Sequence, residues 1–196
     1  MIKSLWVIFM KVTLGVSRRH VHLTEEVWTK LFGGEPMVKR NDLGQPGQYA
    51  TTSKVDVSVG DKKIEGLRVI GPVRKYNQIE LAQTDADILG INPPRRQSGD
   101  LEDSLPITVS GPCGSVDLDK GAILAEMHIH MTPEMANELN IVDKQIAKVF
   151  RGEEHLFDAA IKIADPAALE LHIDTDEANE YNLETGDILD FRVCGK

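Results

Sequence analysis

The chain has 196 residues, of which 41% are hydrophobic and 27% charged, which predicts an ordinary globular protein of one or two compact domains. Its formal net charge of −9 argues against a general nucleic-acid binder, which would need a basic surface. Apolar stretches fall well short of the roughly 20 residues that span a bilayer, which argues against a membrane protein.

The first two thirds of the chain alternate short β-forming runs with turns. The segment 41–49 is too rich in Gly, Pro and amide residues for regular structure, which predicts a loop. Short strands with frequent turns favour small β-barrels or sandwiches with a few helices. The expected elements, in order, are an extension or first strand over 1–10, a strand over 12–23 interrupted at Gly15 and at 17–19, a helix over 25–32 ended by Gly33 and Gly34, a hairpin of 55–59 with 64–70, a strand over 73–81, a helical turn over 84–89, a loop over 92–103, and strands over 107–109 and 115–118.

One pattern, His-apolar-His-apolar-Thr-x-Glu, occurs twice, at 20–26 and at 128–134. Side chains alternate faces along a strand, so both histidines of each copy are predicted to point the same way. Thr24 and Thr132 are predicted to cap helices, with Pro133 at the first helical position, where its missing N–H costs nothing. Each histidine pair is therefore expected to end a strand that leads into a helix.

A third, partial copy follows the second by 42 positions, because residues 130–140 align with residues 172–182. A strand, helix and strand unit is therefore predicted twice in the last third, with His172 in the place of His130. We expect a mainly β fold with short helices, in which one small barrel is inserted in another. The first barrel would combine residues 11–18 and 127–196, and the second would span residues 19–126.

Adjacent imidazoles on one strand face are costly to bury unless something bridges them, which favours metal binding. Nitrogen ligands with a carboxylate suit zinc, although nickel, cobalt and iron are also compatible with these ligands. Four or five histidines exceed the needs of one open catalytic zinc site, so the pattern predicts two divalent metals.

Five motifs, taken in order, resemble the PduL-type phosphotransacylases, which interconvert acyl-CoA and phosphate with acyl phosphate and CoA. The resemblance covers residues 12 to 193, and it implies two β-barrels, a two-zinc site and acetyl-CoA or propanoyl-CoA as substrate. The motifs are His-Val-His-Leu after Ser-x-Arg (17–23), Gln-Pro-Gly-Gln (45–48), Gly-Pro-Val-Arg (71–74), Ser-Gly-Asp-Leu (98–101) and His-Ile-His-Met (128–131).

The same resemblance implies roles for individual residues. One metal would be held by His20, His22 and Glu80, and the other by His128, His130 and His172. Arg74 would bind phosphate, which suits a permanently charged guanidinium that can form two parallel hydrogen bonds. The implied CoA contacts and pocket residues are Val16, Ser17, Arg18, Arg68, Asn179, Gln45, Gln48 and Ser98.

Three alternatives stand beside this interpretation. Cys113 could act as a nucleophile, although a cysteine in a Gly-Pro-Cys-Gly turn without a motif-linked base favours a structural role. A metal-dependent thioester or amide hydrolase would use bound hydroxide in place of phosphate. A noncatalytic CoA- or metal-binding module would use its metal only to stabilise the fold.

Cellular context is predicted from few features. With only Cys113 and Cys194 the chain has no disulfide framework, which indicates a reducing cytoplasm. Family members in bacterial microcompartments carry an amphipathic N-terminal extension. The short run before Lys11, apolar throughout from Leu5 to Met10, argues against such packaging. A free enzyme that makes acetyl phosphate is then at least as well supported as one that serves propanediol breakdown. A homodimer is also expected.

Overall fold

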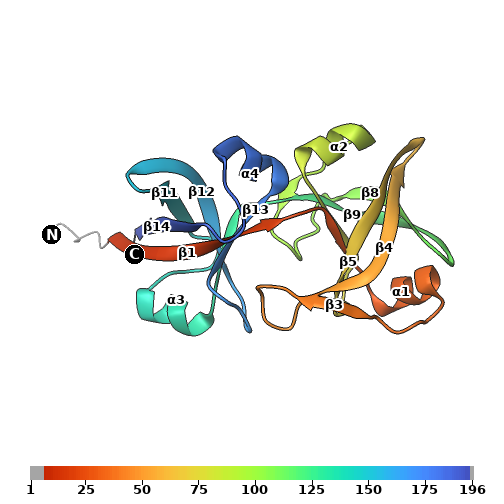
Figure 1. Cartoon of the computed structure of the whole chain (residues 1–196), viewed down its shortest axis with the longest axis horizontal. Coiled ribbons are helices and arrows are strands. Elements are labelled where there is room, and N and C mark those ends of the chain that lie inside the picture. The colour runs from red at the N-terminus through yellow and green to blue at the C-terminus, as the bar shows by residue number, and fades with distance from the viewer. Residues whose placement is uncertain (1–6, 195–196) are drawn as a thin grey trace. The chain divides into compact units, whose positions relative to one another are not determined.

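The computed structural model describes residues 7–194, which form fourteen strands and four helices (Figure 1). They divide into two compact units, each with its own hydrophobic core. Among the described helices, none has the length and apolar character that crossing a membrane requires. The first unit contains residues 7–17, 44–46 and 126–194, and the second contains Arg18–Leu43 and Gly47–Ala125.

The first unit is a closed six-stranded barrel. Along its first strand Val12 and Leu14 are buried while Lys11 and Thr13 are exposed, as expected of a strand with one face on a core. Neighbouring strands pair antiparallel except for β1 with β13 and β10 with β12, which are parallel. The order around the barrel is β1 (Val7–Ser17), β13 (Glu170–Asp174), β10 (His128–Met131), β12 (Glu154–Ile163), β11 (Ile146–Arg151) and β14 (Ile188–Cys194).

The second unit also closes a ring of six strands, because β8 pairs with both β4 and β9. Two further strands, β3 (Lys39–Asp42) and β7 (Arg95–Arg96), extend this sheet beside β4 and β9. The predicted fold class, mainly β with one small barrel inserted in another, is confirmed. The ring order is β4 (Tyr49–Val59), β5 (Lys62–Gly71), β2 (His20–His22), β6 (Gln78–Leu81), β9 (Gly114–Ala125) and β8 (Leu105–Gly111).

Three of the four helices begin directly after a histidine-bearing strand: α1 (Glu25–Phe32), α3 (Pro133–Leu139) and α4 (Thr175–Tyr181). The predicted caps are confirmed, because Thr24 and Thr132 accept hydrogen bonds from backbone N–H groups three residues later. Asp174 takes this place in the third copy. The predicted repeat of a strand, helix and strand is confirmed as β10-α3-β11 and β13-α4-β14.

One predicted strand is shorter than expected. Of the segment 73–81, only Gln78–Leu81 forms a strand, β6, which is followed by α2 (Gln83–Leu89). The earlier residues bond to the loop that follows β2: Arg74 donates its backbone N–H to Leu23, and Asn77 Oδ1 accepts from Thr24. This bent segment has the propensity of a strand, but these two polar groups are bonded to the loop after β2 in place of a neighbouring strand.

The predicted extension over residues 1–10 lies partly outside the described residues, which begin at 7. Residues 7–10 belong to β1, where Met10 is paired with Phe191 of β14. Of the two interpretations of this segment, a first strand applies to its described part.

Candidate functional site

The histidine pair of the second unit meets a glutamate from the neighbouring strand. β2 runs antiparallel to β6, with His20 opposite Glu80. The Nε2 atoms of His20 and His22 lie 3.2 Å apart, and oxygens of Glu80 lie 3.5 Å and 4.0 Å from these two nitrogens respectively. We call His20, His22 and Glu80 the β2 cluster.

The protonation of the β2 cluster suits metal binding. A backbone carbonyl can only accept, so the 2.9 Å contact of His20 Nδ1 with the Arg18 carbonyl requires a proton on Nδ1. The Nε2 atom of neutral His20 then carries a lone pair toward the cluster. Burial, followed by the proximity of His20, lowers the pKa of His22 to about 3. His22 is therefore neutral at physiological pH, which is the form that binds metals.

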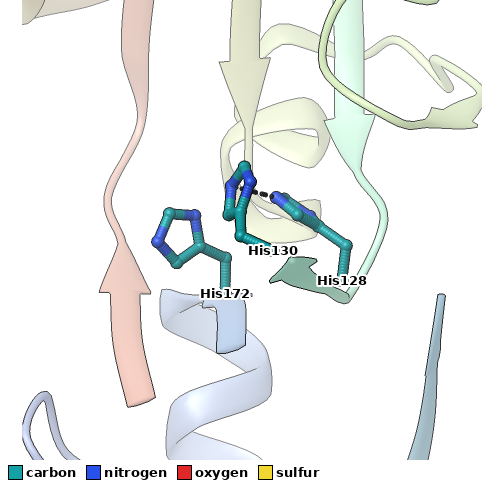
Figure 2. A group of neighbouring side chains, drawn as sticks. All are labelled: His128, His130 and His172. Atoms are coloured by element: carbon teal, nitrogen blue, oxygen red, sulfur yellow. Dashed lines mark hydrogen bonds between the residues drawn. The ribbon is translucent and has the colours of Figure 1, made fainter. Parts of the chain in front are cut away.

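The first unit brings together three imidazoles from two antiparallel strands (Figure 2). His128 lies opposite His172 in the ladder of β10 and β13, and the ring centroids of His128, His130 and His172 are 4.7 to 5.2 Å apart. His128 Nε2 lies 3.1 Å from His130 Nε2, while its Nδ1 donates to the Glu126 carbonyl at 2.7 Å. This repeats the arrangement at His20. We call the three histidines the β10 cluster.

Both clusters fit a divalent metal. In each, the three donor atoms lie within 4.8 Å of one another. Two nitrogens bound to tetrahedral zinc at about 2.0 to 2.1 Å stand about 3.3 Å apart. The paired Nε2 atoms are 3.2 Å and 3.1 Å apart, which is close to that spacing. His22, Glu80, His128 and His130 are buried, where adjacent donors without a bridging ion are costly.

Arg74 lies beside the β2 cluster. Burial and His20 have the largest effects on the lowered pKa of His22, and the positive charge of Arg74 adds to them. The Nε atom of Arg74 is buried and has no hydrogen-bond partner among the described residues. A buried donor without an acceptor costs free energy, so this arginine is suited to receive an anion.

Two of the predicted CoA and pocket residues lie next to the β2 cluster. Arg68 is paired with His20 between β5 and β2, and its guanidinium donates to two backbone carbonyls of β4. Ser98 accepts a 2.8 Å hydrogen bond from Gln78 Nε2, which also donates to Glu80. These contacts link Ser98 to the cluster through one intervening amide.

Two others lie outside the cluster. Arg18 is exposed between β1 and β2, and it contacts His20 through its backbone carbonyl. Gln48 is half-buried directly before β4, and its carbonyl accepts from the backbone N–H of Leu43.

The other three predicted CoA contacts belong to the first unit. Val16 and Ser17 end β1 and pair with residues 173 and 174 of β13, and the backbone N–H of Val16 donates to Thr185. Asn179 is exposed on α4.

Gln45, predicted to line the pocket, is buried in the first unit. Its amide exchanges hydrogen bonds with the backbone of Ala168 and donates to Glu170 at 2.8 Å.

Two residues next to the ligands were missed by the sequence analysis. Gln78 and Glu170 each stand two positions before a candidate ligand, Glu80 and His172, and each is bonded to that ligand. The signal was present, because residues two apart on a strand share a face. It was overlooked because neither residue belongs to a histidine pair.

Cys113 lies in the turn between β8 and β9 and is exposed. Its backbone N–H donates to the carbonyl of Leu31 at the end of α1. The turn is thereby tied to a helix end, which agrees with the structural role favoured by its sequence.

Two barrels, each with three candidate metal ligands at a strand that leads into a helix, agree with the resemblance to the PduL-type phosphotransacylases. The family model for phosphate propanoyltransferase matches residues 13–184, which include both clusters and Arg74. The chain belongs to this family, the PduL-type phosphotransacylases.

Relatives named phosphate propanoyltransferase match nearly the whole chain. The protein from Thermotoga maritima is 46% identical over 184 residues, which cover 91% of this chain and 87% of the relative. That from Clostridioides difficile is 42% identical over 90% of this chain and 87% of its own length. That from Rhodopseudomonas palustris is 38% identical over 95% and 83%.

Proposed function

We propose that this protein reversibly transfers a short acyl group, acetyl or propanoyl, between CoA and phosphate. The observation that carries the proposal is the family match over residues 13–184, which spans Arg74 and all six candidate ligands. The acid–base state of the β2 cluster supports it, because His22 is held neutral and ready to coordinate.

Each cluster is proposed to hold one divalent metal, with zinc as the first candidate. His20, His22 and Glu80 would hold one, and His128, His130 and His172 the other. Bound there, such ions would polarise the thioester carbonyl and stabilise the charge that develops on its oxygen. The backbone carbonyls of Arg18 and Glu126 keep the first imidazole of each pair in the tautomer that leaves Nε2 unprotonated.

Arg74 is proposed to hold the phosphate that attacks. A guanidinium can bind two phosphate oxygens at once, and the buried Nε of Arg74 has a donor to offer. A phosphate oxygen would then form a bond to the carbonyl carbon while the carbon–sulfur bond breaks. The electron pair leaves with sulfur as the CoA thiolate, which takes a proton from water. This direct displacement does not pass through an acyl-enzyme, and we assign no chemical role to Cys113.

CoA is proposed to contact the residues that the family resemblance implies. These residues are Val16, Ser17, Arg18, Arg68 and Asn179. Gln48 and Ser98 would line the pocket, and the family resemblance implies the same role for Gln45.

The predicted homodimer and cytoplasmic location remain proposals. Two cysteines without a disulfide framework support a reducing compartment. Light scattering on the purified full chain measures the oligomeric state directly, and a mass of about 22 kDa, that of one chain, would contradict the dimer.

The test of function is thiol release from acetyl-CoA by the zinc-loaded protein, with and without phosphate. We expect release that requires phosphate, together with acyl phosphate in equal amount, and a second run with propanoyl-CoA gives the acyl preference. Release without phosphate would favour a thioester hydrolase. Tight binding of acyl-CoA without any release would favour the noncatalytic module.

A further inference from the structure

The two clusters share a fourth position that follows from strand register. In the β2–β6 pair, His20 is opposite Glu80 and His22 is opposite Gln78. In the β10–β13 pair, His128 is opposite His172 and His130 is opposite Glu170. Each cluster is therefore a square of two pairs, in which the fourth corner is Gln78 in one unit and Glu170 in the other.

Each fourth-corner residue forms a hydrogen bond with the candidate ligand on its own strand. The fourth-corner residue is the donor in one cluster and the acceptor in the other. Gln78 is completely buried, and its amide N–H donates to the Glu80 carboxylate at 2.5 Å. Glu170 accepts at 2.8 Å from Nε2 of His172. An amide donor thus faces a carboxylate ligand, and a carboxylate acceptor faces an imidazole ligand.

Glu170 is itself held by neighbours. Its Oε2 atom, which accepts from His172, also accepts from Gln45 Nε2 at 2.8 Å. The Gln45 amide is anchored in turn by two 3.2 Å hydrogen bonds with the backbone of Ala168. With only 4% of Gln45 exposed, this amide is part of the interior of the first unit.

Two glycines leave room for this carboxylate. A Cβ atom at Gly15, which is paired with His172, would stand 3.0 Å from Glu170 Oε1 and 3.1 Å from His172 Cδ2. A Cβ atom at Gly44 would overlap the Glu170 carboxyl group. A side chain at Gly44 would therefore displace the Glu170 carboxyl group, and one at Gly15 would press against it.

The hydrogen bond to Glu170 determines which nitrogen His172 turns toward the cluster. A carboxylate can only accept, so Nε2 of His172 carries the proton and Nδ1 of the neutral ring carries the lone pair. In Figure 2, Nδ1 of His172 is the nitrogen next to the ring carbon that is attached to Cβ, and it lies on the side of His130. The other ring nitrogen, Nε2, points away. A carboxylate in this position also makes an imidazole a stronger ligand.

We propose that Glu170, fixed by Gln45, is a positioning residue of the β10 cluster that acts through His172 and has Gln78 as its counterpart in the β2 cluster. This inference rests on the metal centre of the proposed function. It assigns Gln45 a place behind a metal ligand, in contrast to the pocket-lining role predicted from the family resemblance.

The test measures zinc affinity at the β10 cluster alone. In the full-length chain, His20→Ala with His22→Ala disables the β2 cluster and provides the background. Zinc affinity is then measured by competition with a chromophoric chelator for the background and for Glu170→Ala, Glu170→Gln and Glu138→Gln. Glu138 is an exposed glutamate on α3 and serves as the matched control. Visible spectra of the Co²⁺ forms report the ligand geometry, and thermal unfolding reports the fold.

We expect Glu170→Ala to weaken zinc binding by about 10- to 100-fold and to change the Co²⁺ spectrum, as loss of outer-shell partners of histidine ligands does. Glu170→Gln keeps an oxygen that can accept both hydrogen bonds but loses the charge, so a smaller loss is expected. Glu138→Gln should match the background in both readouts.

The outcomes separate the inference from the function on which it rests. Equal zinc affinity in the background and in Glu170→Ala would overturn the positioning role and leave the metal centre intact. A background that binds no zinc would overturn the metal centre and the inference together. If Glu170→Ala does not fold, Glu170→Gln decides, because an affinity equal to the background contradicts the role and a weaker one supports it.

Discussion

The backbone N–H of Arg74 donates a 2.7 Å hydrogen bond to the carbonyl of Leu23, the residue that directly follows His22. This bond fixes the bent segment before β6 against the end of β2. It brings a permanently charged side chain next to a histidine pair that lies 52 and 54 positions earlier in the chain. The relationship explains how Arg74 and Glu80, which are too far apart along an extended strand, belong to one neighbourhood.

Arg74→Ala is expected to lower kcat/KM for phosphate by at least about 100-fold, because a charge-assisted, two-point contact to the nucleophile is lost. Arg74→Lys keeps the charge but not the fork of donors, so it should recover only part of the activity. Steady-state kinetics with varied phosphate measure both effects. The exposed neighbour Lys75→Ala is the control, and an equal loss in that variant would assign the effect to general surface charge.

The pH dependence of stability should report His22 in the metal-free protein. Burial, then His20, lowers its folded pKa to about 3 from the ordinary value of 6.5. Between these values the unfolded chain binds a proton that the folded protein does not, so the contribution of His22 to stability falls as pH decreases from 6.5 toward 3.

The measurement is denaturant unfolding of the metal-free parent and His22→Gln at several pH values. The parent should lose up to about 1.4 kcal/mol per pH unit more than the variant within this window. Parallel curves for the two proteins would show that His22 does not titrate as assigned.

Gln78→Ala should destabilise the fold as well as the site. The substitution removes the donor of the hydrogen bonds to Glu80 and Ser98. It also removes the amide oxygen that accepts from the backbone N–H of Gly99. We expect the free energy of unfolding to fall by about 2 to 4 kcal/mol. Gln83→Ala removes only a solvent-exposed hydrogen bond to Asp87 on α2, so it should change the free energy of unfolding by less than about 0.5 kcal/mol. Urea titration compares the two, and equal effects would contradict the network.

The N-cap of α4 should contribute more to the free energy of unfolding than the N-cap of α1. Asp174 accepts from the N–H groups of Asp176 and Glu177, and its own N–H donates to the Glu177 carboxylate. Thr24 accepts from one N–H at 3.3 Å. Asp174→Ala is therefore expected to cost about 2 kcal/mol and Thr24→Ala about 1 kcal/mol. Thermal and denaturant unfolding test this order of the two losses. Asp174→Asn should keep most of the stability that Asp174→Ala loses.

Cys113→Ser is expected to keep full transfer activity, because the proposed displacement by phosphate forms no bond to the protein. Thiol release from acetyl-CoA in the presence of phosphate measures this. A variant that folds but does not turn over would restore Cys113 as the nucleophile.

Much of the local structure was predictable from sequence because the physical causes are local. The alternation of His20 and His22 with apolar residues is enough to place both imidazoles on one face of a strand. The cap residues Thr24 and Thr132, together with Pro133, are enough to start the helices. Side-chain oxygens and missing N–H groups act within a few residues of their own position.

The sequence by itself determined the histidine pairs, the caps, the barrel class and, through five motifs, the family. Only the tertiary structure decided which side chains complete each pair, because that depends on strand register. Opposite His130 stands Glu170, and opposite His22 stands Gln78, a choice made by hydrogen-bond ladders between strands far apart in the chain. The short β6 and the bend at Arg74 were likewise decided by bonds to another segment, which no local propensity encodes.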